Sequence, residues 1–236
     1  MATRNRIIDK LDDLEPELAQ AFRDAVRQIR SRARLARLEA AIDRGDFQAA
    51  IRAAGIDRSA AVWALVTEQM RQAYIEGGRF FQSEAPARFG FVFDMNNPRA
   101  EAWLRANSSR LITEISDDQR EAVRVGLEAG SRRGDNPRRT ALNLVGRIGQ
   151  SGRREGGIVG LTSRQAQAVE NARDELLAGD SAYFQRKRRD KRFDGLLRRA
   201  IARGEGLSEA TPTGLLPDTV TACYSSAAKP SPGPRR

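Results

Sequence analysis

The chain has 236 residues, no histidine and a single cysteine, Cys223. The absence of histidine excludes Ser-His-Asp and Cys-His nucleophilic mechanisms, as well as zinc sites built on histidine. One cysteine excludes an internal disulfide and a metal site made of several cysteines. A pair of carboxylates could still act as acid and base, but it needs a pocket to shift its pKa values, and no sequence feature marks one. We therefore expect a protein that is not an enzyme and holds no cofactor, metal or small-molecule substrate.

Aromatic residues and long apolar runs are also scarce. Aromatics make up 6% of the chain, and no apolar run approaches the roughly 20 residues that a membrane span needs. Strands draw on aromatic and β-branched residues, so this composition favours helices rich in alanine and leucine. The N-terminus lacks the apolar region of a signal peptide, so we expect folding in the cytoplasm. The predicted fold class is all-α, an elongated arrangement of helical hairpins with a disordered C-terminal tail.

Positive charge is abundant. The net charge is +10 and the sequence pI is about 10.8, which predicts acidic partners, with nucleic acid first among them. Residues 183–203 hold nine Lys or Arg against two Asp, and we predict one basic helix there. Tyr183, Phe184 and Phe193 interleave with the cations, a pattern that suits phosphate contacts with base stacking, although a solvated basic face is the alternative. The candidate contact residues are Arg186, Lys187, Arg188, Arg189, Lys191, Arg192, Arg198 and Arg199.

Residues 1–84 predict an N-terminal helical arm. A helix start is expected after Asp13, and from there the apolar residues of 18–42 recur at three- and four-residue steps, as one stripe. Gly45 should end this helix, a short helix should follow over 47–54, and another should start near Asp57. Within that last helix the pair Gly77-Gly78 predicts a bend or a close helix crossing. The candidate partner-docking residues on the stripe are Phe22, Val26 and Ile29.

Four helix starts follow one another after a linker over 85–97, where a short strand is allowed near 89–93. Two are Asn-Pro pairs, with asparagine as the cap and proline at the first helical position, and two have the spacing of a capping box. A connector over 151–160 holds four glycines and is predicted to be a mobile loop. The starts are Asn97-Pro98, Ser116 with Gln119, Asn136-Pro137, and Thr162 with Gln165, which predict helices over 98–115, 117–133, 137–149 and 162–178.

The order of these starts, with a Gly-Leu-Thr-Ser-Arg-Gln-Ala entry to the last helix, resembles the head-morphogenesis (minor head) proteins of tailed phages, the Mu F-like family. The resemblance covers about 89–207 and depends on the succession of short motifs. It implies a structural or assembly protein of a phage or prophage head, which docks on portal or capsid proteins during capsid morphogenesis. It also implies a location in the host cytoplasm during assembly and then in the virion head.

Two other functions remain open. One is a basic helical nucleic-acid-binding protein, such as a DNA-packaging accessory. The helices 117–133 and 137–149 could form a helix-turn-helix, but a plain helical hairpin fits the spacing as well and is preferred. The other is an enzyme built on the carboxylates near 101–121. We rank it last, because Asp117 and Asp118 are explained by the negative charge that a helix N-terminus favours.

Residues 208–236 differ from the rest of the chain. This segment holds five of the nine prolines and the only cysteine. Its composition predicts a disordered tail. A second hypothesis is a frameshift near Ala210, because one set of GC-rich codons for the tail, read two nucleotides later, encodes a charged helical sequence without a stop; the chain would then be a truncated family member. The predicted segments are thus a helical arm over 1–84, a linker over 85–97, a head-morphogenesis-like domain over 98–207 and a tail over 208–236.

Overall fold

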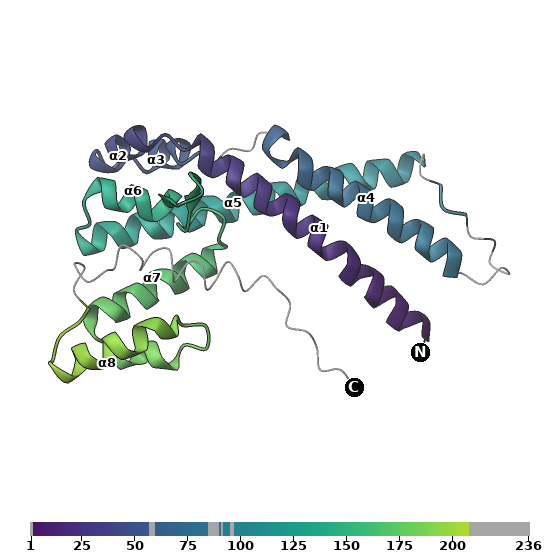
Figure 1. Ribbon diagram of the computed structural model, residues 1–236. Coiled ribbons are helices and arrows are strands. Elements are labelled where there is room, and N and C mark those ends of the chain that lie inside the picture. The colour runs from purple at the N-terminus through teal and green to yellow at the C-terminus, as the bar shows by residue number, and fades with distance from the viewer. Residues whose placement is uncertain (1, 57–59, 85–89, 91, 95–96, 208–236) are drawn as a thin grey trace. The chain divides into compact units, whose positions relative to one another are not determined.

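The computed structural model describes residues 2–56, 60–84, 90, 92–94 and 97–207. These residues form eight α-helices, two short 3-10 helices and one two-stranded antiparallel sheet (Figure 1). The all-α prediction is confirmed. The predicted tail, the helix start at Asp57 and most of the predicted linker lie outside the described residues, and the described residues 90 and 92–94 are not in a strand.

The chain divides into two compact units that interleave along the sequence. Among the described residues, unit 1 falls within 2–28 and 60–116, and unit 2 comprises 29–56 and 117–207. Helices α1 (Ala2–Arg32) and α5 (Pro98–Arg133) each belong partly to both units. The units do not follow the predicted segments 1–84 and 98–207, because cap motifs mark where helices begin and not which helices pack together.

Unit 1 combines the larger part of α1 with α4 (Ala60–Glu84) and the first half of α5. The rings of Phe22 and Trp63 lie 5.9 Å apart, and the Lys10 ammonium donates to Glu76 at 2.8 Å. Tyr74 on α4 lies 5.9 Å from the ring of Trp103 on α5. These contacts join α4 to both of its neighbours.

Helix α1 differs from its prediction at both ends. It does not start after Asp13 but runs through Pro16, so the turn before the proline stays helical despite the lost backbone hydrogen bond. It ends at Arg32, and α2 (Leu35–Asp43) starts after a break, so the predicted stripe over 18–42 belongs to two helices. Gly45, with a φ of +67°, follows the end of α2 as expected.

Unit 2 is built around the second half of α5. Helix α2 packs on α3 (Phe47–Ala53) and on α6 (Pro137–Val145). A Cβ added to Gly126 would lie 2.4 Å from Cδ1 of Ile158, and one added to Gly130 would lie 2.6 Å from Oγ1 of Thr140. These two glycines therefore let α6 and the loop after it approach the α5 backbone closely.

Three of the four predicted helix starts are confirmed. Oδ1 of Asn97 accepts from the Arg99 N–H at 3.0 Å, and Oδ1 of Asn136 accepts from the Arg139 N–H at 2.8 Å. Thr162 and Gln165 form a complete capping box at the start of α7 (Ser163–Ala178). These caps are formed by residues two or three positions apart, which is why the sequence alone identifies them.

The predicted start at Ser116 is wrong, because α5 is one continuous helix of 36 residues. The Ser116 hydroxyl donates back to the Ile112 carbonyl at 2.7 Å, as a serine inside a helix does. Gln119 does not close a capping box. Its amide donates to the Leu161 carbonyl and accepts from the Gly160 N–H, both at 2.6 Å.

The connector over 151–160 is not a free loop along its whole length. Strands β1 (Arg147–Ile148) and β2 (Arg154–Glu155) form a hairpin, and the chain after it is buried at Ile158 and Val159. The Val159 N–H donates to the Leu144 carbonyl at 2.9 Å, and its own carbonyl accepts from Arg30 Nε at 3.0 Å. Backbone and side-chain bonds therefore fix this glycine-rich segment against α6 and the end of α1.

Helix α6 ends at Val145, four residues before its predicted end, because Gly146 turns the chain into the hairpin. Gly146 has a φ of +84°, and a Cβ there would lie 2.3 Å from the Glu155 carbonyl oxygen. Both the left-handed backbone and the close approach require glycine at this position.

Candidate binding surface of the C-terminal module

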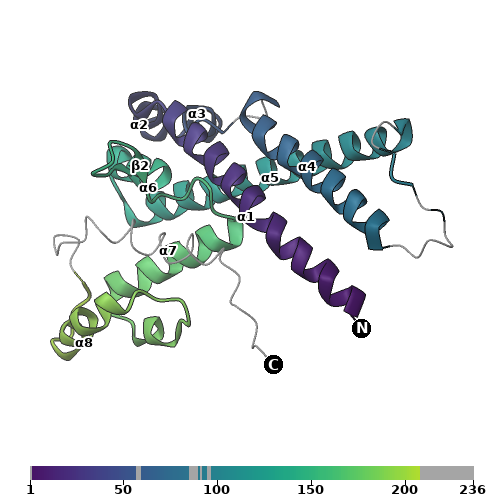
Figure 2. The same ribbon diagram turned by 45° about the vertical axis from the view of Figure 1, so that its right-hand side comes forward.

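Residues 161–207 form a module with its own hydrophobic core. Helix α7 is followed by the 3-10 helices η2 (Ser181–Gln185) and η3 (Lys191–Phe193) and by α8 (Asp194–Ala202). Helices α7 and α8 lie side by side in both ribbon views (Figures 1 and 2). The buried core residues are Leu161, Val169, Ala172, Leu176, Tyr183, Phe193, Leu197, Ala200 and Leu207.

The predicted single basic helix over 183–203 is therefore wrong. The chain turns back at 186–190, and only 194–202 is α-helical. Tyr183 is completely buried, and its hydroxyl donates to the Asp190 carbonyl at 3.0 Å. Phe193 is also buried, so two of the three aromatic residues predicted to stack on bases belong to the core instead.

Two of the predicted contact arginines are used inside the module. Arg186 donates two hydrogen bonds to Glu175 on α7, at 2.5 and 2.7 Å. Arg189 pairs with Asp194 at the start of α8 at 3.0 Å, and this hydrogen bond lowers the pKa of the Asp194 carboxyl. Because both ion pairs fix the 186–190 segment, these arginines position the surface and do not form it.

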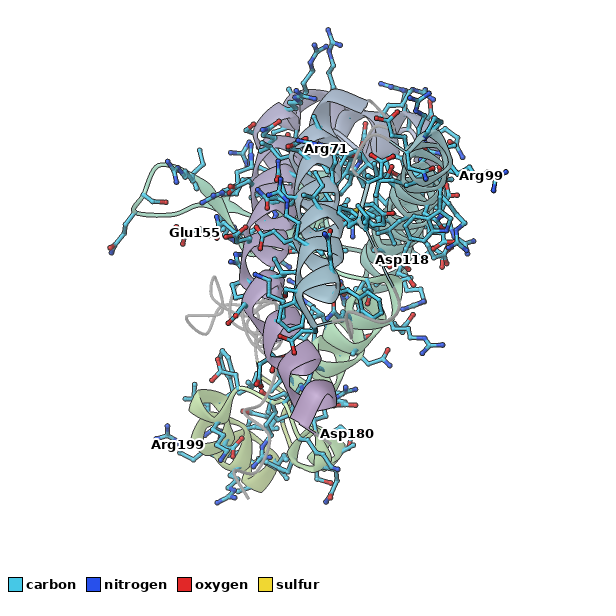
Figure 3. The ribbon with its side chains drawn as sticks, turned by 90° about the vertical axis from the view of Figure 1, so that its right-hand side faces the viewer. Arg71, Arg99, Asp118, Glu155, Asp180 and Arg199 are labelled. Atoms are coloured by element: carbon cyan, nitrogen blue, oxygen red, sulfur yellow. The ribbon has the colours of Figure 1, made fainter. Side chains whose placement is uncertain are left out.

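The other described cations of the predicted set are exposed. Arg198 lies over the ring of Phe184, with its guanidinium carbon 5.4 Å from the ring centroid. Arg199 donates to the Gly195 carbonyl at 3.2 Å and points outward from α8 (Figure 3). The side chain of Arg192 lies outside the described part of the structure. We call the exposed set the basic face: Lys187, Arg188, Lys191, Arg198 and Arg199.

None of these five cations forms an ion pair with an acidic side chain among the described residues. The exposed acids of the module are Asp180 and Glu205. Glu205 pairs with Arg203 at 3.0 Å, and the Asp180 side chain caps η2 by accepting from the Ala182 N–H. Lys191 and Arg198 act on the Asp194 carboxyl through space and help to lower its pKa, but no ion pair among the described residues neutralises the basic face.

The predicted docking stripe is not a free surface. Val26 and Ile29 are 8% and 1% exposed, and Phe22 packs against Trp63. Their spacing reflects core packing, which produces the same three- and four-residue steps as a binding stripe. Val26 and Ile29 are therefore not available to a docking partner.

Helix α6 does not have the exposure of a recognition helix. It has nine residues, packs on α2, and buries Thr140, Ala141, Asn143, Leu144 and Val145. Its exposed Arg138 lies 3.6 Å from Glu39. These contacts favour the helical-hairpin interpretation over a helix-turn-helix.

Comparisons with protein-family models, with curated proteins and with solved structures find no match to this chain. Within its described residues, no helix combines the length and apolarity needed to cross a bilayer. The same residues contain no group of three or more acidic or cysteine side chains placed to hold a metal ion.

A buried ion cluster joins the end of α5, the turn that follows it and α7, and the sequence interpretation missed it. Arg133 at the end of α5 contacts Glu170 at 2.6 Å, Asp174 at 2.9 Å and Asp135 at 3.1 Å. Burial raises the pKa of Glu170, against the opposing effect of Arg133 and Arg173. Burial by itself would lower the pKa of Arg133. The combined effect of its partners Glu170, Asp174 and Asp135 is larger, so the pKa is raised above its ordinary value.

This cluster has a structural role, because its members bond one another across α5, the turn after it and α7. A signal for it was present in the sequence. Glu170 lies four residues after Ala166 and one after Val169, on the apolar face of α7, where a carboxylate requires a cationic partner. The partner could not be named, because Arg133 is 37 positions away along the chain.

Proposed function

We propose that this chain is a structural assembly protein of a tailed-phage or prophage head, a minor head protein that acts near the portal during capsid morphogenesis. The observation that carries the proposal is the succession of short motifs over 97–162, which resembles that of the head-morphogenesis family; three of the four, at Asn97, Asn136 and Thr162, begin helices, and the Ser116 motif lies inside α5. In support, residues 117–207 of the segment that resembles the family lie in one compact unit. Polar side chains of this segment cap helices or form hydrogen bonds and ion pairs that join its helices and loops. Such a protein functions through surfaces that bind partners.

Exposed apolar side chains of unit 1 are the candidates for docking on the portal, in place of the buried stripe. Trp103 is 56% exposed although it lies beside Tyr74, and Leu65 and Leu111 are exposed as well. Exposed aromatic residues often contribute most of the energy of protein interfaces.

Co-expression with the portal and major capsid proteins of the same phage or prophage tests this function. We expect the chain to co-purify with the portal and to sediment with assembled particles. Trp103→Ala should weaken portal binding at least tenfold, whereas Ile148→Ala, a matched loss of an exposed apolar side chain in the hairpin, should not. The proposal would be contradicted if the chain co-purified with the portal no more than an unrelated protein does and if particles assembled without containing it.

A second candidate function is a basic nucleic-acid-binding protein such as a DNA-packaging accessory. The observation that favours it is the basic face, whose cations lie within thirteen residues of one module. The two functions are compatible in one protein, because the basic face and Trp103 belong to different units.

A further inference from the structure

We propose that the basic face binds the phosphate backbone of duplex DNA and does not read the base sequence. The proposal rests on the second candidate function and is independent of the assembly role. It specifies the form of the nucleic acid, the chemical groups contacted and the residues responsible.

The cations of the basic face are held on a fixed scaffold. Lys187 and Arg188 lie on the segment that the Arg186–Glu175 and Arg189–Asp194 pairs hold in place. Lys191, Arg198 and Arg199 lie on η3 and α8, whose inner faces pack into the module core. Such a fixed array loses little conformational freedom when it meets a rigid ligand.

Base stacking is not available to this surface. Tyr183 and Phe193 are in the core, and Arg198 covers the ring of Phe184. Proteins that prefer single strands combine cations with exposed aromatic side chains on which the bases stack. Without these platforms, the surface favours the ligand with the denser phosphate array, which is duplex DNA.

Sequence reading is not available either. Helix α8 has nine residues and is about 14 Å long at 1.5 Å per residue. Its outward positions include Gly195, Arg198 and Arg199 but neither Asn nor Gln, the side chains that read adenine. Arginine can read guanine through two donors, but Arg198 lies over the Phe184 ring and Arg199 Nε donates to the Gly195 carbonyl, so both groups already make contacts within the module. We therefore expect equal affinity for unrelated duplexes.

An acidic protein surface would also attract these cations. Duplex DNA carries about one negative charge per 1.7 Å of its axis, a density that few carboxylate surfaces reach, and it releases condensed counterions when it is neutralised. Five exposed cations within thirteen residues gain most from such a ligand, which is why DNA is the partner that this face fits best.

The test uses the full chain and fluorescence anisotropy with a labelled duplex of about 30 base pairs. If all five cations contact phosphates, a plot of log affinity against log salt should have a slope of about −4.5, so the affinity should fall about 500-fold between 50 and 200 mM salt. The triple variant Lys187→Gln, Arg188→Gln, Lys191→Gln should reduce the slope to about −1.8 and the loss to about 12-fold. The three side chains are exposed, and circular dichroism checks that the variant folds.

The control variant Arg37→Gln, Arg44→Gln, Arg52→Gln removes the same charge from exposed positions on and beside α2 and α3. It should keep the slope of the original chain. An equal loss in both variants would show that net charge alone drives binding, and would overturn the proposal. So would tighter binding of a single strand, a preference for one of two unrelated duplexes, or equal affinity for polyglutamate.

Portal binding of the same triple variant separates the two proposals. Retained portal binding with lost DNA affinity supports both functions. A chain that binds the portal but shows no salt-dependent DNA affinity overturns only the DNA proposal, and one that binds DNA but not the portal contradicts only the assembly role.

Discussion

Gln119 on α5 bonds the segment after the hairpin with both its amide nitrogen and its amide oxygen. In Gln119→Leu, the Gly160 N–H and the Leu161 carbonyl would lose their partner in a buried place. An unsatisfied buried polar group costs about 1–3 kcal/mol, so we expect the free energy of unfolding to fall by about 2–4 kcal/mol. Urea denaturation measures this change.

Gln167 supplies the control, because it is exposed and bonds only Asn171 on its own helix. Gln167→Leu should change the free energy of unfolding by less than about 0.5 kcal/mol. Equal effects of the two substitutions would show that Gln119 does not hold the loop.

The ion cluster gives a pH-dependent prediction. Arg133→Met leaves Glu170 buried without its nearest cation, and breaking a buried pair costs about 3–5 kcal/mol. Burial already raises the pKa of Glu170, and losing Arg133 should raise it further. Glu170 in the folded variant then binds a proton more readily than in the unfolded chain. The free energy of unfolding of the variant should therefore fall furthest below that of the original chain at neutral pH, and this difference should shrink as the pH falls through the raised pKa of Glu170.

Unfolding of Arg133→Met and of the original chain, measured in parallel from pH 8 to pH 5, tests this sign. A deficit that stays constant or grows toward acid would mean that Glu170 does not titrate in the folded variant. Arg124→Met should show no such trend, since Arg124 pairs with Glu121 and Glu128 on the exposed surface of the same helix.

At the scale of the element, two adjacent glycines of α4 have opposite surroundings. A Cβ on Gly77 would meet nothing within 4 Å, whereas one on Gly78 would lie 2.2 Å from a ring carbon of Phe93. Gly77→Ala should stabilise the helix by about 0.5–1 kcal/mol. Gly78→Ala should destabilise the chain by about 1–3 kcal/mol, because the Phe93 ring must move.

Thermal unfolding of the two variants tests this pair, each serving as the control for the other. The predicted close helix crossing at Gly77-Gly78 is not found: α4 continues through both residues, and the near neighbour of Gly78 is the ring of Phe93, which is not in a helix. Stabilisation by both substitutions would show that Phe93 does not pack on α4.

The local parts of the fold were predictable from the sequence, and the non-local parts were not. Asn136 and Thr162 were identified as caps because each bonds a residue three positions away. Ser116 has the same spacing to Gln119, but the partners of Gln119 lie more than 40 residues away, and only tertiary structure reveals them. The basic residues of the candidate surface were identified by composition, yet Arg186 and Arg189 were assigned to the surface because their carboxylate partners could not be foreseen.

At the scale of the whole molecule, the continuity of α5 is open to direct measurement. In a continuous helix the N–H groups of residues 117–119 donate to carbonyls one turn earlier. In a helix that starts at Ser116 the same groups would have no backbone acceptor. We expect slow hydrogen exchange at these three amides, measured by NMR.

The amide of Arg164, in the first turn of α7, is the comparison. It has no acceptor among the described residues and should exchange quickly. Exchange at residues 117–119 as fast as at Arg164 would show that α5 breaks where the cap motif suggested.

The glycine-rich segment after α6 also decides where the chain tolerates a cut. Its glycine-rich composition suggests a linker, and a domain boundary chosen from the sequence alone would fall there. The hairpin tip around Arg153 is exposed, so trypsin can cleave there (Figure 3 labels Glu155 on the hairpin). From Gly157 to Leu161 the chain is mostly buried and is bonded to α6 and Gln119. Fragments divided at residue 153 should remain associated after cleavage, whereas chains that end or begin between 157 and 161 would lose part of the core.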